Sequence, residues 1–320
     1  MPETGEMTGI IHAVCMSKTK GIGKEPVPEA YLKEDWGIEH DAHAGAWHRQ
    51  VSLLSYDKVV EFNKNGAGVK DGDFGENLVV EGIFFRTLPV GTILRIFTPE
   101  GEPGPVLEMT QIGKECHNGC AIRQRMGVCI MPIEGVFAKV LQGGFVHPGD
   151  RMSVEPVKPD RPFTAAVITV SDRSAAGERE DLSGPAARAM LEEAGYDVIE
   201  TIVIPDEAEQ IKRWLMHFAD QRQVSLVITS GGTGFSMRDC TPEAALEVAD
   251  RVAPGIAEAI RMRSLEITDR AMLSRGVSVI RKQTLIVTLP GSPKAVRESL
   301  GFILKALDHG LGILRGSATD

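Results

Sequence analysis

The chain has 320 residues, of which 42% are hydrophobic and 25% charged, a composition typical of a globular protein with two domains of about 150 residues each. Its formal net charge of −9 argues against a nucleic-acid-binding protein, because phosphate recognition needs a local excess of Lys and Arg, and no basic run stands out. No apolar stretch approaches the ~20 residues of a membrane helix, and residues 1–6 are polar, so we expect no membrane association and a cytoplasmic location.

The first half of the chain alternates short apolar runs with turns rich in glycine and proline, which indicates β-structure. The expected strands are residues 51–55, 77–80, 92–97, 106–112 and 151–154. We therefore expect a mostly-β domain, a barrel, over residues 1–155. Four of the five cysteines also lie here, an arrangement unlike a secreted disulfide scaffold that indicates thiol or metal chemistry. These four are Cys15, Cys116, Cys120 and Cys129.

Residues 156–162 form the expected linker. Pro156, Pro159 and Pro162 stand three residues apart, a spacing that favours an extended connector and excludes a helix. We place the domain boundary in this segment.

Strand and helix patterns alternate after the linker. The expected strands are 165–170, 198–204, 226–229 and 284–289, and the expected helices are 184–194, 207–220, 242–249 and 294–307. Repeated βα units predict a three-layer α/β domain over residues 163–320, with a largely parallel sheet and helices on both faces. Ligands of such sheets bind at the carboxyl ends of the strands.

A glycine-rich turn follows the strand at 226–229. Its glycines let backbone N–H groups approach an anion closely and its hydroxyls add donors, so a phosphate cradle is one interpretation. The alternative is a tight strand exit in which the glycines only supply positive φ angles. The residues of this turn are Ser230, Gly231, Gly232, Thr233 and Gly234.

Two aspartates precede helices in this half. Asp239 stands between the cradle and a helix for which we expect Thr241 as N-cap and Pro242 as first residue. A carboxylate beside a phosphate cradle is suited to bind Mg²⁺; alternatively, Asp239 caps the helix or pairs with Arg238. Asp206 ends the strand at 198–204, where capping of the next helix is the simplest role.

A third turn joins the strand at 284–289 to a helix. Its free N–H groups, the Ser292 hydroxyl and the Lys294 ammonium could hold phosphate, and the alternative is a simple βα connection. The residues of the turn that we select are Pro290, Gly291, Ser292 and Lys294.

Together with Thr169-Val-Ser171-Asp172-Arg and Asp181-Leu-Ser-Gly, these motifs resemble, in order and spacing, the molybdopterin adenylyltransferase (MoaB/Mog) family. The resemblance covers residues 163–316 and implies that the terminal phosphate of molybdopterin attacks the α-phosphorus of Mg-ATP. It implies Asp206 and Asp239 as essential, metal-binding carboxylates. It also implies nucleotide or substrate contacts from the three turns, Arg238, Ser171 and Asp172, and a homotrimer.

Residues 9–156 resemble the MOSC domain, named after the C-terminal domain of molybdenum cofactor sulfurase. The resemblance rests on three polar, turn-rich clusters and the closing segment 143–150. The clusters are Gly37-Ile-Glu-His40-Asp-Ala-His43-Ala-Gly45 with Arg49, Asp73-Phe-Gly-Glu-Asn-Leu78, and Gly113-Lys-Glu-Cys116-His-Asn-Gly-Cys120. It implies that Cys116 carries or receives sulfur as a persulfide, or handles a cofactor.

Several alternatives remain at the cysteines and histidines of this half. Lys114 and His117 favour a Cys116 thiolate, which Glu115 opposes. Cys116 and Cys120 could instead bind metal, ranked below thiol chemistry, or form a disulfide, whereas the apolar neighbours of Cys129 indicate a core residue. His40 and His43 could hold an anionic cofactor near Arg49, or do nothing.

For the whole protein we expect an enzyme of molybdenum or tungsten cofactor biosynthesis. The C-terminal domain would adenylylate the pterin, and the N-terminal domain would bind, sulfurate or deliver a related cofactor, with a sulfur donor or molybdoenzyme as partner. The first alternative is a non-catalytic cofactor carrier, which the two aspartates disfavour. The second is a thiol-based redox or metal sensor that uses Cys116 and Cys120.

Overall fold

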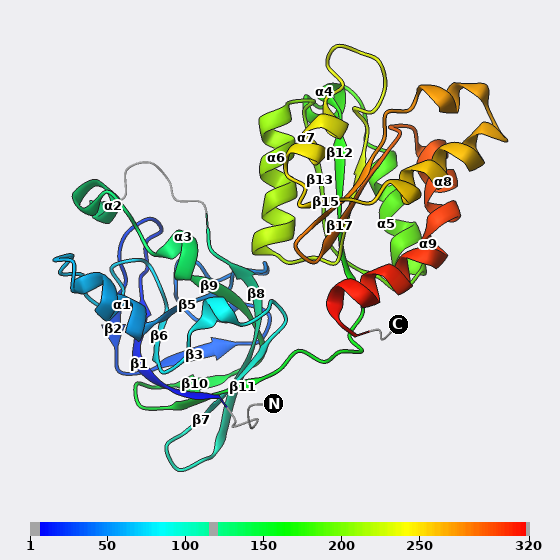
Figure 1. The fold of residues 1–320 in the computed structure, drawn as a ribbon. Helices are drawn as coiled ribbons and strands as arrows, with labels where there is room; N and C mark the ends of the chain where they lie inside the picture. The colour runs from blue at the N-terminus through cyan, green and yellow to red at the C-terminus, as the bar shows by residue number, and fades with distance from the viewer. Residues whose placement is uncertain (1–6, 115–120, 318–320) are drawn as a thin grey trace. The chain divides into compact units, whose positions relative to one another are not determined.

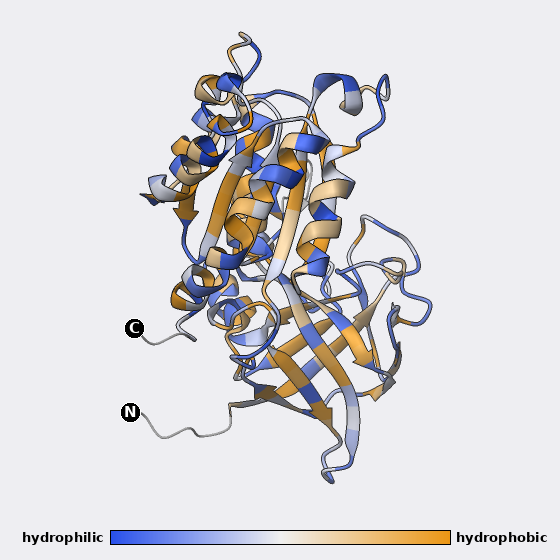
Figure 2. Ribbon diagram, turned by 90° about the vertical axis from the view of Figure 1, so that its right-hand side faces the viewer, coloured by the Kyte–Doolittle hydropathy of each residue, from blue (hydrophilic) through white to orange (hydrophobic). Residues whose placement is uncertain are grey.

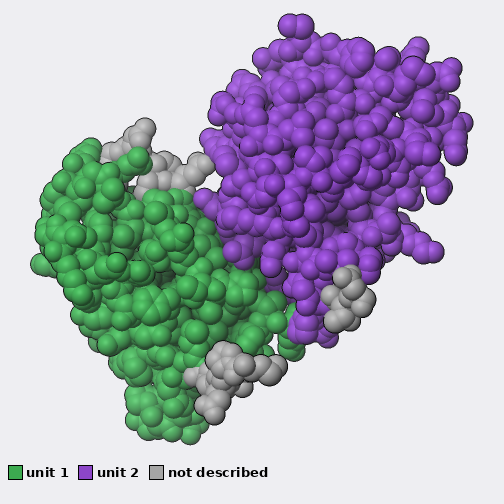
Figure 3. Space-filling model, in the orientation of Figure 1, with its two compact units in different colours: residues 1–158 green, residues 159–320 purple. Residues whose placement is uncertain are grey.

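The computed structural model describes residues 7–114 and 121–317, and the chain divides into two compact units, Met1–Lys158 (unit 1) and Pro159–Asp320 (unit 2; Figure 3). The division lies within the proline-rich segment 156–162. No helix among the described residues is long and apolar enough to span a membrane.

Unit 1 is built on a closed barrel of seven strands (Figure 1). The barrel was expected, and five of its strands lie at the predicted segments, whereas β1 and β9 were not predicted. The strand order is β11-β7-β8-β9-β5-β6-β1, and β1 pairs again with β11 to close the ring. All of these pairs are antiparallel except β5 with β6. The strands are β1 (Thr8–Met16), β5 (Val51–Ser55), β6 (Leu78–Glu81), β7 (Ile93–Phe97), β8 (Pro103–Ile112), β9 (Val136–Gln142) and β11 (Arg151–Glu155).

Shorter elements surround the barrel. β2 (Glu25–Val27) adds to β1, and a small sheet has the order β10-β3-β4. Its strands are β3 (Ala30–Lys33), β4 (Gly37–Ile38) and β10 (Gly144–Val146). The helices are α1 (Tyr56–Asn63), a 3₁₀ turn (Phe85–Thr87), α2 (Ala121–Met126) and α3 (Met131–Glu134).

The barrel interior is the main core of unit 1. Leu53, Leu78, Leu94 and Leu107 come from four different strands and are fully buried in one cluster. Because strand side chains alternate between the two faces, every second residue reaches this interior. Each such leucine stabilises the folded state by about 1.5–3 kcal/mol relative to an exposed position. Burial of the apolar face therefore favours closure of the sheet into a barrel.

Unit 2 has one six-stranded sheet in the order β13-β12-β14-β17-β16-β15. The first four strands are parallel, as predicted, whereas β16 pairs antiparallel with β17 and β15 pairs antiparallel with β16, so the sheet is mixed. The antiparallel edge arises because only Lys282 and Gln283 join β16 to β17, a connection too short for a crossover. The strands are β12 (Thr164–Val170), β13 (Asp197–Ile204), β14 (Leu226–Ser230), β15 (Arg251–Val252), β16 (Ser278–Arg281) and β17 (Thr284–Leu289).

Helices cover both faces of this sheet, which gives the predicted three layers (Figures 1 and 2). One core contains residues of α5, α8 and α9, and the other contains residues of α6 and α7. Ala165 and Val167 face the first core, whereas Ala166 and Ile168 face the second, as alternation along β12 requires. The helices are α4 (Asp172–Ala175), α5 (Ser183–Glu193), α6 (Ala208–Met216) with a π-helical end (His217–Gln221), α7 (Thr241–Glu247), α8 (Pro254–Leu265), a 3₁₀ segment (Asp269–Leu273) and α9 (Pro293–Arg315).

Candidate functional site

The three turns selected from the sequence lie at one edge of the unit 2 sheet. β13, β12, β14 and β17 are parallel neighbours, so their carboxyl ends point the same way. Asp172 follows β12, Asp206 follows β13, the glycine turn follows β14 and Pro290 follows β17. The topology thus brings together loops that are far apart in the chain, from Asp172 to Pro290, at the edge where α/β sheets bind ligands.

The glycine turn requires glycine for steric reasons. Gly231 and Gly232 have φ angles of 111° and 64°. A Cβ on Gly231 would lie 2.1 Å from the Val170 carbonyl oxygen, and one on Gly232 would lie 2.2 Å from Thr241 Oγ1 and 2.6 Å from Asp206 Oδ1. Both the positive φ and the close approach that the sequence suggested are therefore present, and the turn brings the Gly232 backbone against two oxygen atoms.

Those two oxygens have no hydrogen-bond partner among the described residues. Asp206 Oδ1 and Thr241 Oγ1 are both shielded from solvent. Burial raises the pKa of Asp206 above its ordinary value, and the nearby charges of Asp172 and Asp239 raise it further. Buried oxygens without partners are costly in a folded protein, so they mark a place where a ligand or water completes the structure.

Two capping expectations are wrong. Glu207, not Asp206, is the N-cap of α6, and it makes no side-chain capping bond. Cys240 occupies the N-cap of α7, so the helix begins at Thr241, one residue earlier than predicted. The side chains of Asp206 and Thr241 consequently stay available to the space around Gly232.

Arg238 pairs with Asp172 and not with Asp239. Its Nε and Nη2 donate to the two carboxylate oxygens of Asp172 at 3.0 and 2.8 Å. Asp172 Oδ1 also accepts the backbone N–H of Asp206 at 3.0 Å. The hydrogen bond from Arg238 lowers the pKa of Asp172. Asp239 Oδ2 instead accepts the N–H of Ser236 at 3.2 Å within its own loop.

Arg275, which no sequence motif indicated, clamps this loop. Its Nε donates to the carbonyl of Gly234 and its Nη2 to the carbonyl of Asp239, both at 2.7 Å, and Nη1 pairs with Glu243. Beside these contacts lies an open concavity of about 470 Å³. Its lining residues are Phe235, Ser236, Met237, Asp239, Cys240, Glu243 and Arg275.

The remaining residues predicted for unit 2 lie at the same edge of the sheet, several of them in structural contacts. Ser171 caps α4, and Ser292 caps α9 by accepting the N–H of Ala295 at 3.2 Å. Ser230 Oγ donates to the carbonyl of Pro290 at 3.2 Å, which ties the glycine turn to the third turn. Lys294 is largely exposed, 3.8 Å from Glu298.

Gly291 approaches the glycine turn as well. A Cβ on Gly291 would lie 3.2 Å from the Cα of Gly231. Thr233 is buried, and its carbonyl accepts the backbone N–H of Arg275 at 3.0 Å. Gly234 lies against Asp239, whose Oδ2 is 2.8 Å from the position of an added Cβ. The turns after β14 and β17 therefore pack directly on each other and on the Asp239 loop.

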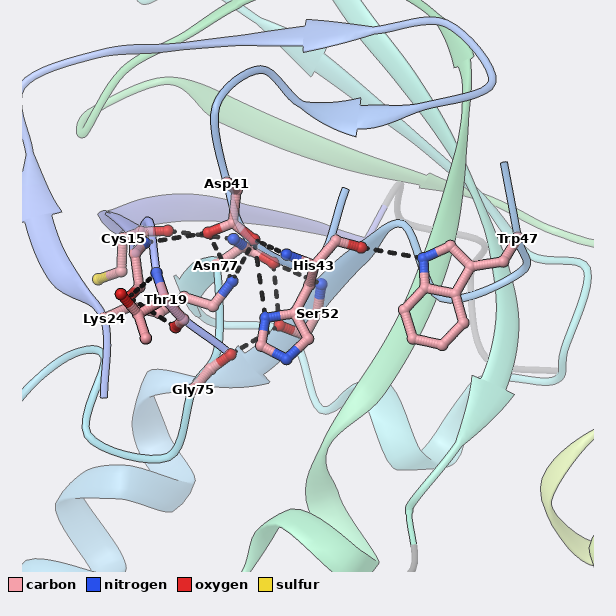
Figure 4. Close-up of polar contacts among 10 residues, drawn as sticks. Cys15, Thr19, Lys24, Asp41, His43, Trp47, Ser52, Gly75 and Asn77 are labelled. Carbon is pink, nitrogen blue, oxygen red and sulfur yellow. Dashed lines mark hydrogen bonds and ion pairs between the residues drawn. The ribbon is translucent and has the colours of Figure 1, made fainter. Parts of the chain in front are cut away.

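In unit 1 the polar cluster of residues 37–45 contributes Asp41 to a buried ion pair that the sequence did not reveal (Figure 4). Lys24 Nζ lies 2.7 and 2.8 Å from the two oxygens of Asp41, and both side chains are essentially inaccessible. Asp41 also accepts the N–H groups of Ser17 and His43, each at 3.0 Å. Burial, followed by the charge of Lys24, lowers the pKa of His43, so its imidazole is neutral near pH 7.

The chain then continues from His43 towards Arg49. Trp47 Nε1 donates to the His43 carbonyl at 2.9 Å, and the Arg49 guanidinium lies 4.6 Å from the centre of the Trp47 ring. Phe137 lies 5.5 Å from the same guanidinium, so two aromatic rings hold it. His40 is exposed and turns the chain with a φ of 67°.

The predicted sulfur-handling residues Cys116 and Cys120, with His117, lie outside the described residues. The described segment ends nearby at Gly113 and Lys114, where the Gly113 carbonyl accepts a hydrogen bond from Gln111 Nε2 at 2.7 Å. Cys129 is half-buried and packs against the cluster that contains Phe62 and Phe74, in line with the core interpretation.

Comparison with known proteins gives a separate match for each unit. Residues 166–309 match the family model described as a probable molybdopterin binding domain, and residues 40–153 match the MOSC domain. A molybdopterin adenylyltransferase of Haemophilus influenzae is 47% identical over 136 residues, which are 42% of this chain and 69% of that protein.

Two further relatives match a similar part of the chain. A molybdopterin adenylyltransferase of Helicobacter pylori is 39% identical over 153 residues, 47% of this chain and 87% of that protein. A crystal structure of a molybdopterin biosynthesis enzyme from Thermus thermophilus is 44% identical and covers 48% of this chain and 97% of its own, with a TM-score of 0.47.

Proposed function

The chain belongs to the molybdopterin adenylyltransferase family through unit 2 and carries a MOSC domain in unit 1, and from this premise we propose the reaction of unit 2. Unit 2 transfers the adenylyl group of ATP to the terminal phosphate of molybdopterin. A pterin phosphate oxygen forms a bond to the α-phosphorus while the bond to the β-phosphate oxygen breaks, which releases pyrophosphate.

The observation that carries this proposal is the buried, partnerless Asp206 Oδ1 at the strand ends. It faces a backbone turn in which only glycine fits, and two further carboxylates lie close enough to raise its pKa. Arg238 neutralises Asp172, but neither Asp206 nor Asp239 forms an ion pair with a described residue, so an Mg-nucleotide would complement these two charges.

Asp206 and Asp239 are the residues that would hold Mg²⁺. Among the described residues no three His, Cys, Asp or Glu side chains gather into a complete metal site. This fits Mg²⁺, which binds through one or two carboxylates together with water and substrate phosphates. When bound, Mg²⁺ would neutralise part of the negative charge on the ATP phosphates.

The protein groups contribute position and charge. In our proposal the glycine turn, Ser171, the turn from Pro290 to Ser292, and Lys294 surround the nucleotide and pterin phosphates, and Arg238 balances charge on them. Because the attacking oxygen belongs to the pterin, no side-chain nucleophile is required.

For unit 1 we propose handling of a related cofactor form or of sulfur. The MOSC match and the placement of Cys116 just beyond Lys114 support this, and Cys116 would act as thiolate or persulfide carrier. The two units would then serve one biosynthetic pathway, of molybdenum or tungsten cofactor.

The test is pyrophosphate release from Mg-ATP with and without molybdopterin, in the wild type, Asp239→Asn and Cys116→Ser. We expect pterin-dependent release that falls at least about 100-fold in Asp239→Asn, because the charge at the metal is lost with little change in volume. Asp269→Asn, an exposed aspartate elsewhere in unit 2, is the matched control and should keep full activity.

Each outcome has a distinct meaning. Full activity of Asp239→Asn would refute the metal-binding role. Pterin binding without any pyrophosphate release in the wild type would establish the carrier alternative instead. Loss of release in Cys116→Ser would mean that the thiol takes part in adenylyl transfer and would contradict the division of labour between the units.

A further inference from the structure

Asp172 joins three loops at the candidate site. It follows β12, and its carboxylate receives two hydrogen bonds from the Arg238 side chain and one from the Asp206 backbone. Arg238 belongs to the loop after β14, and Asp206 to the loop after β13. A single carboxylate therefore fixes an arginine and a proposed metal-binding aspartate relative to each other.

We propose that Asp172 is a positioning residue for adenylyl transfer, which sets the place of Arg238 and of the Asp206 backbone without itself binding substrate. This inference rests on the proposed function of unit 2 and goes beyond it, because it replaces the substrate contact expected for Asp172 with a role through two other residues.

The geometry of the pair is suited to positioning. The two hydrogen bonds use Nε and Nη2 and so fix the plane of the guanidinium. Nη1 of Arg238 makes no hydrogen bond to any described residue and stays available for a phosphoryl oxygen of ATP or of molybdopterin. Both oxygens of Asp172 are already engaged, which leaves this acidic group little capacity to bind a substrate, itself anionic.

Only a carboxylate can make this set of contacts. Oδ1 accepts from both Arg238 Nη2 and the Asp206 N–H, while Oδ2 accepts from Arg238 Nε. An asparagine offers one acceptor oxygen and an amide that repels the guanidinium donors. Asp172→Asn should therefore free Arg238 while it keeps the size of the side chain.

The pair is too exposed to be important for folding. The side chains of Arg238 and Asp172 are 58% and 44% exposed, and ion pairs of this kind contribute little to the stability of a protein. A precise arrangement at a reacting centre, in contrast, has a large effect on rate. Substitution should accordingly change catalysis and leave the melting temperature almost unchanged.

The experiment is a double-mutant cycle in the full chain with Asp172→Asn, Arg238→Gln and the two combined. We expect Asp172→Asn to lower kcat/KM about 10- to 100-fold in the wild-type background. In the Arg238→Gln background the same substitution should lower kcat/KM by at most a few-fold further. Separate KM values for ATP and molybdopterin identify which phosphoryl group meets Arg238. Glu192→Gln, which breaks the exposed Arg188–Glu192 pair on α5, is the matched control and should change nothing.

Two results would overturn the inference. One is an Asp172→Asn enzyme within twofold of the wild type, and the other is a cycle in which the two single effects simply multiply. If the wild type releases no pyrophosphate, the proposed function fails separately. In that case the dissociation constants of the same variants for Mg-ATP and for molybdopterin decide the role of Asp172. Equal dissociation constants in all variants would refute the positioning role of Asp172.

Discussion

Asp41 in unit 1 and Asp206 in unit 2 both have shielded carboxylate oxygens, but their surroundings differ. Asp41 is 1% exposed and receives all of its contacts from the protein, from Lys24 and from the N–H groups of Ser17 and His43. Asp206 has a buried oxygen with no partner among the described residues and faces other carboxylates. Compensation by the protein itself indicates an architectural role, and missing compensation indicates a ligand.

The direction of each pKa shift follows from this difference. Burial alone would raise the pKa of Asp41, yet the hydrogen bond and charge of Lys24 hold it below its ordinary value. Burial also raises the pKa of Asp206, and there the neighbouring Asp172 and Asp239 add to the increase. Unit 1 therefore stabilises the ionised form of its carboxylate, whereas unit 2 disfavours that form, and a bound cation would offset this cost.

The largest effect that we predict from this comparison is on the stability of unit 1. Lys24→Met leaves Asp41 buried without its counter-charge, which should lower the free energy of unfolding of unit 1 by about 3–5 kcal/mol. Hydrogen exchange of peptides from each unit measures this change separately from unit 2. Protection in unit 2 should be unchanged.

The combined variant Lys24→Met with Asp41→Asn serves as the control. It removes both charges, so it should recover part of the stability that the single substitution loses. If Lys24→Met costs less than about 1 kcal/mol, the ion pair is not the architectural feature that its burial implies.

Asp206→Asn should behave in the opposite way. Because the folded protein disfavours the ionised Asp206, an amide should leave unit 2 as stable as before or slightly more stable at pH 7. Adenylylation should nevertheless fall at least about 100-fold, about 2.7 kcal/mol in transition-state stabilisation. Thermal unfolding and pyrophosphate release measure the two quantities. A clear loss of stability in Asp206→Asn would place Asp206 with Asp41 among the structural carboxylates.

The sequence predicted the scaffold of the site more accurately than its contacts. The alternation of strands and helices placed Asp206 and the glycine turn at the carboxyl ends of parallel strands. These strands, β13 and β14, lie on either side of β12, and the structure brings the two loops into contact at Gly232. The sequence suggested Asp239 as the partner of Arg238, because the two residues are adjacent in the chain. In the structure the partner is Asp172, which lies 66 residues away and is brought close by the fold.

Other functional contacts left no signal in the sequence. Lys24 is a lysine in a short polar segment, and lysine is rarely buried, so no spacing rule indicates its pairing with Asp41. Arg275 binds backbone carbonyls of Gly234 and Asp239, and a backbone acceptor carries no residue type that a motif could show. The antiparallel edge was missed because β15 and β16 are short, and because the turn from β16 to β17 is Lys282-Gln283, not an Asn-Gly or Asp-Gly pair.

The smallest effect that we predict concerns Glu76. Its carboxylate has an oxygen without a described partner, as Asp206 has, but it lies in unit 1. Glu76 is fully buried; Oε1 accepts the N–H of Gly72 at 2.8 Å, and Oε2 has no partner among the described residues. Burial raises its pKa from 4.5 to about 6. The stability that this proton supplies is complete below about pH 4.5 and is lost as the pH rises through 6, a loss of about 2 kcal/mol.

Glu76→Gln keeps the acceptor for Gly72 and removes the titration. If the buried carboxylate is only a cost to folding, the variant should match the wild type near pH 4.5 and be up to about 2 kcal/mol more stable at pH 8, as urea unfolding followed by hydrogen exchange in unit 1 would measure. An unchanged pH dependence would remove Glu76 from the titrating groups of unit 1. A variant less stable than the wild type at pH 8 would mean that the ionised carboxylate is compensated in solution. Glu76 would then belong with Asp206, among the carboxylates that a ligand or ion completes, although it lies in unit 1.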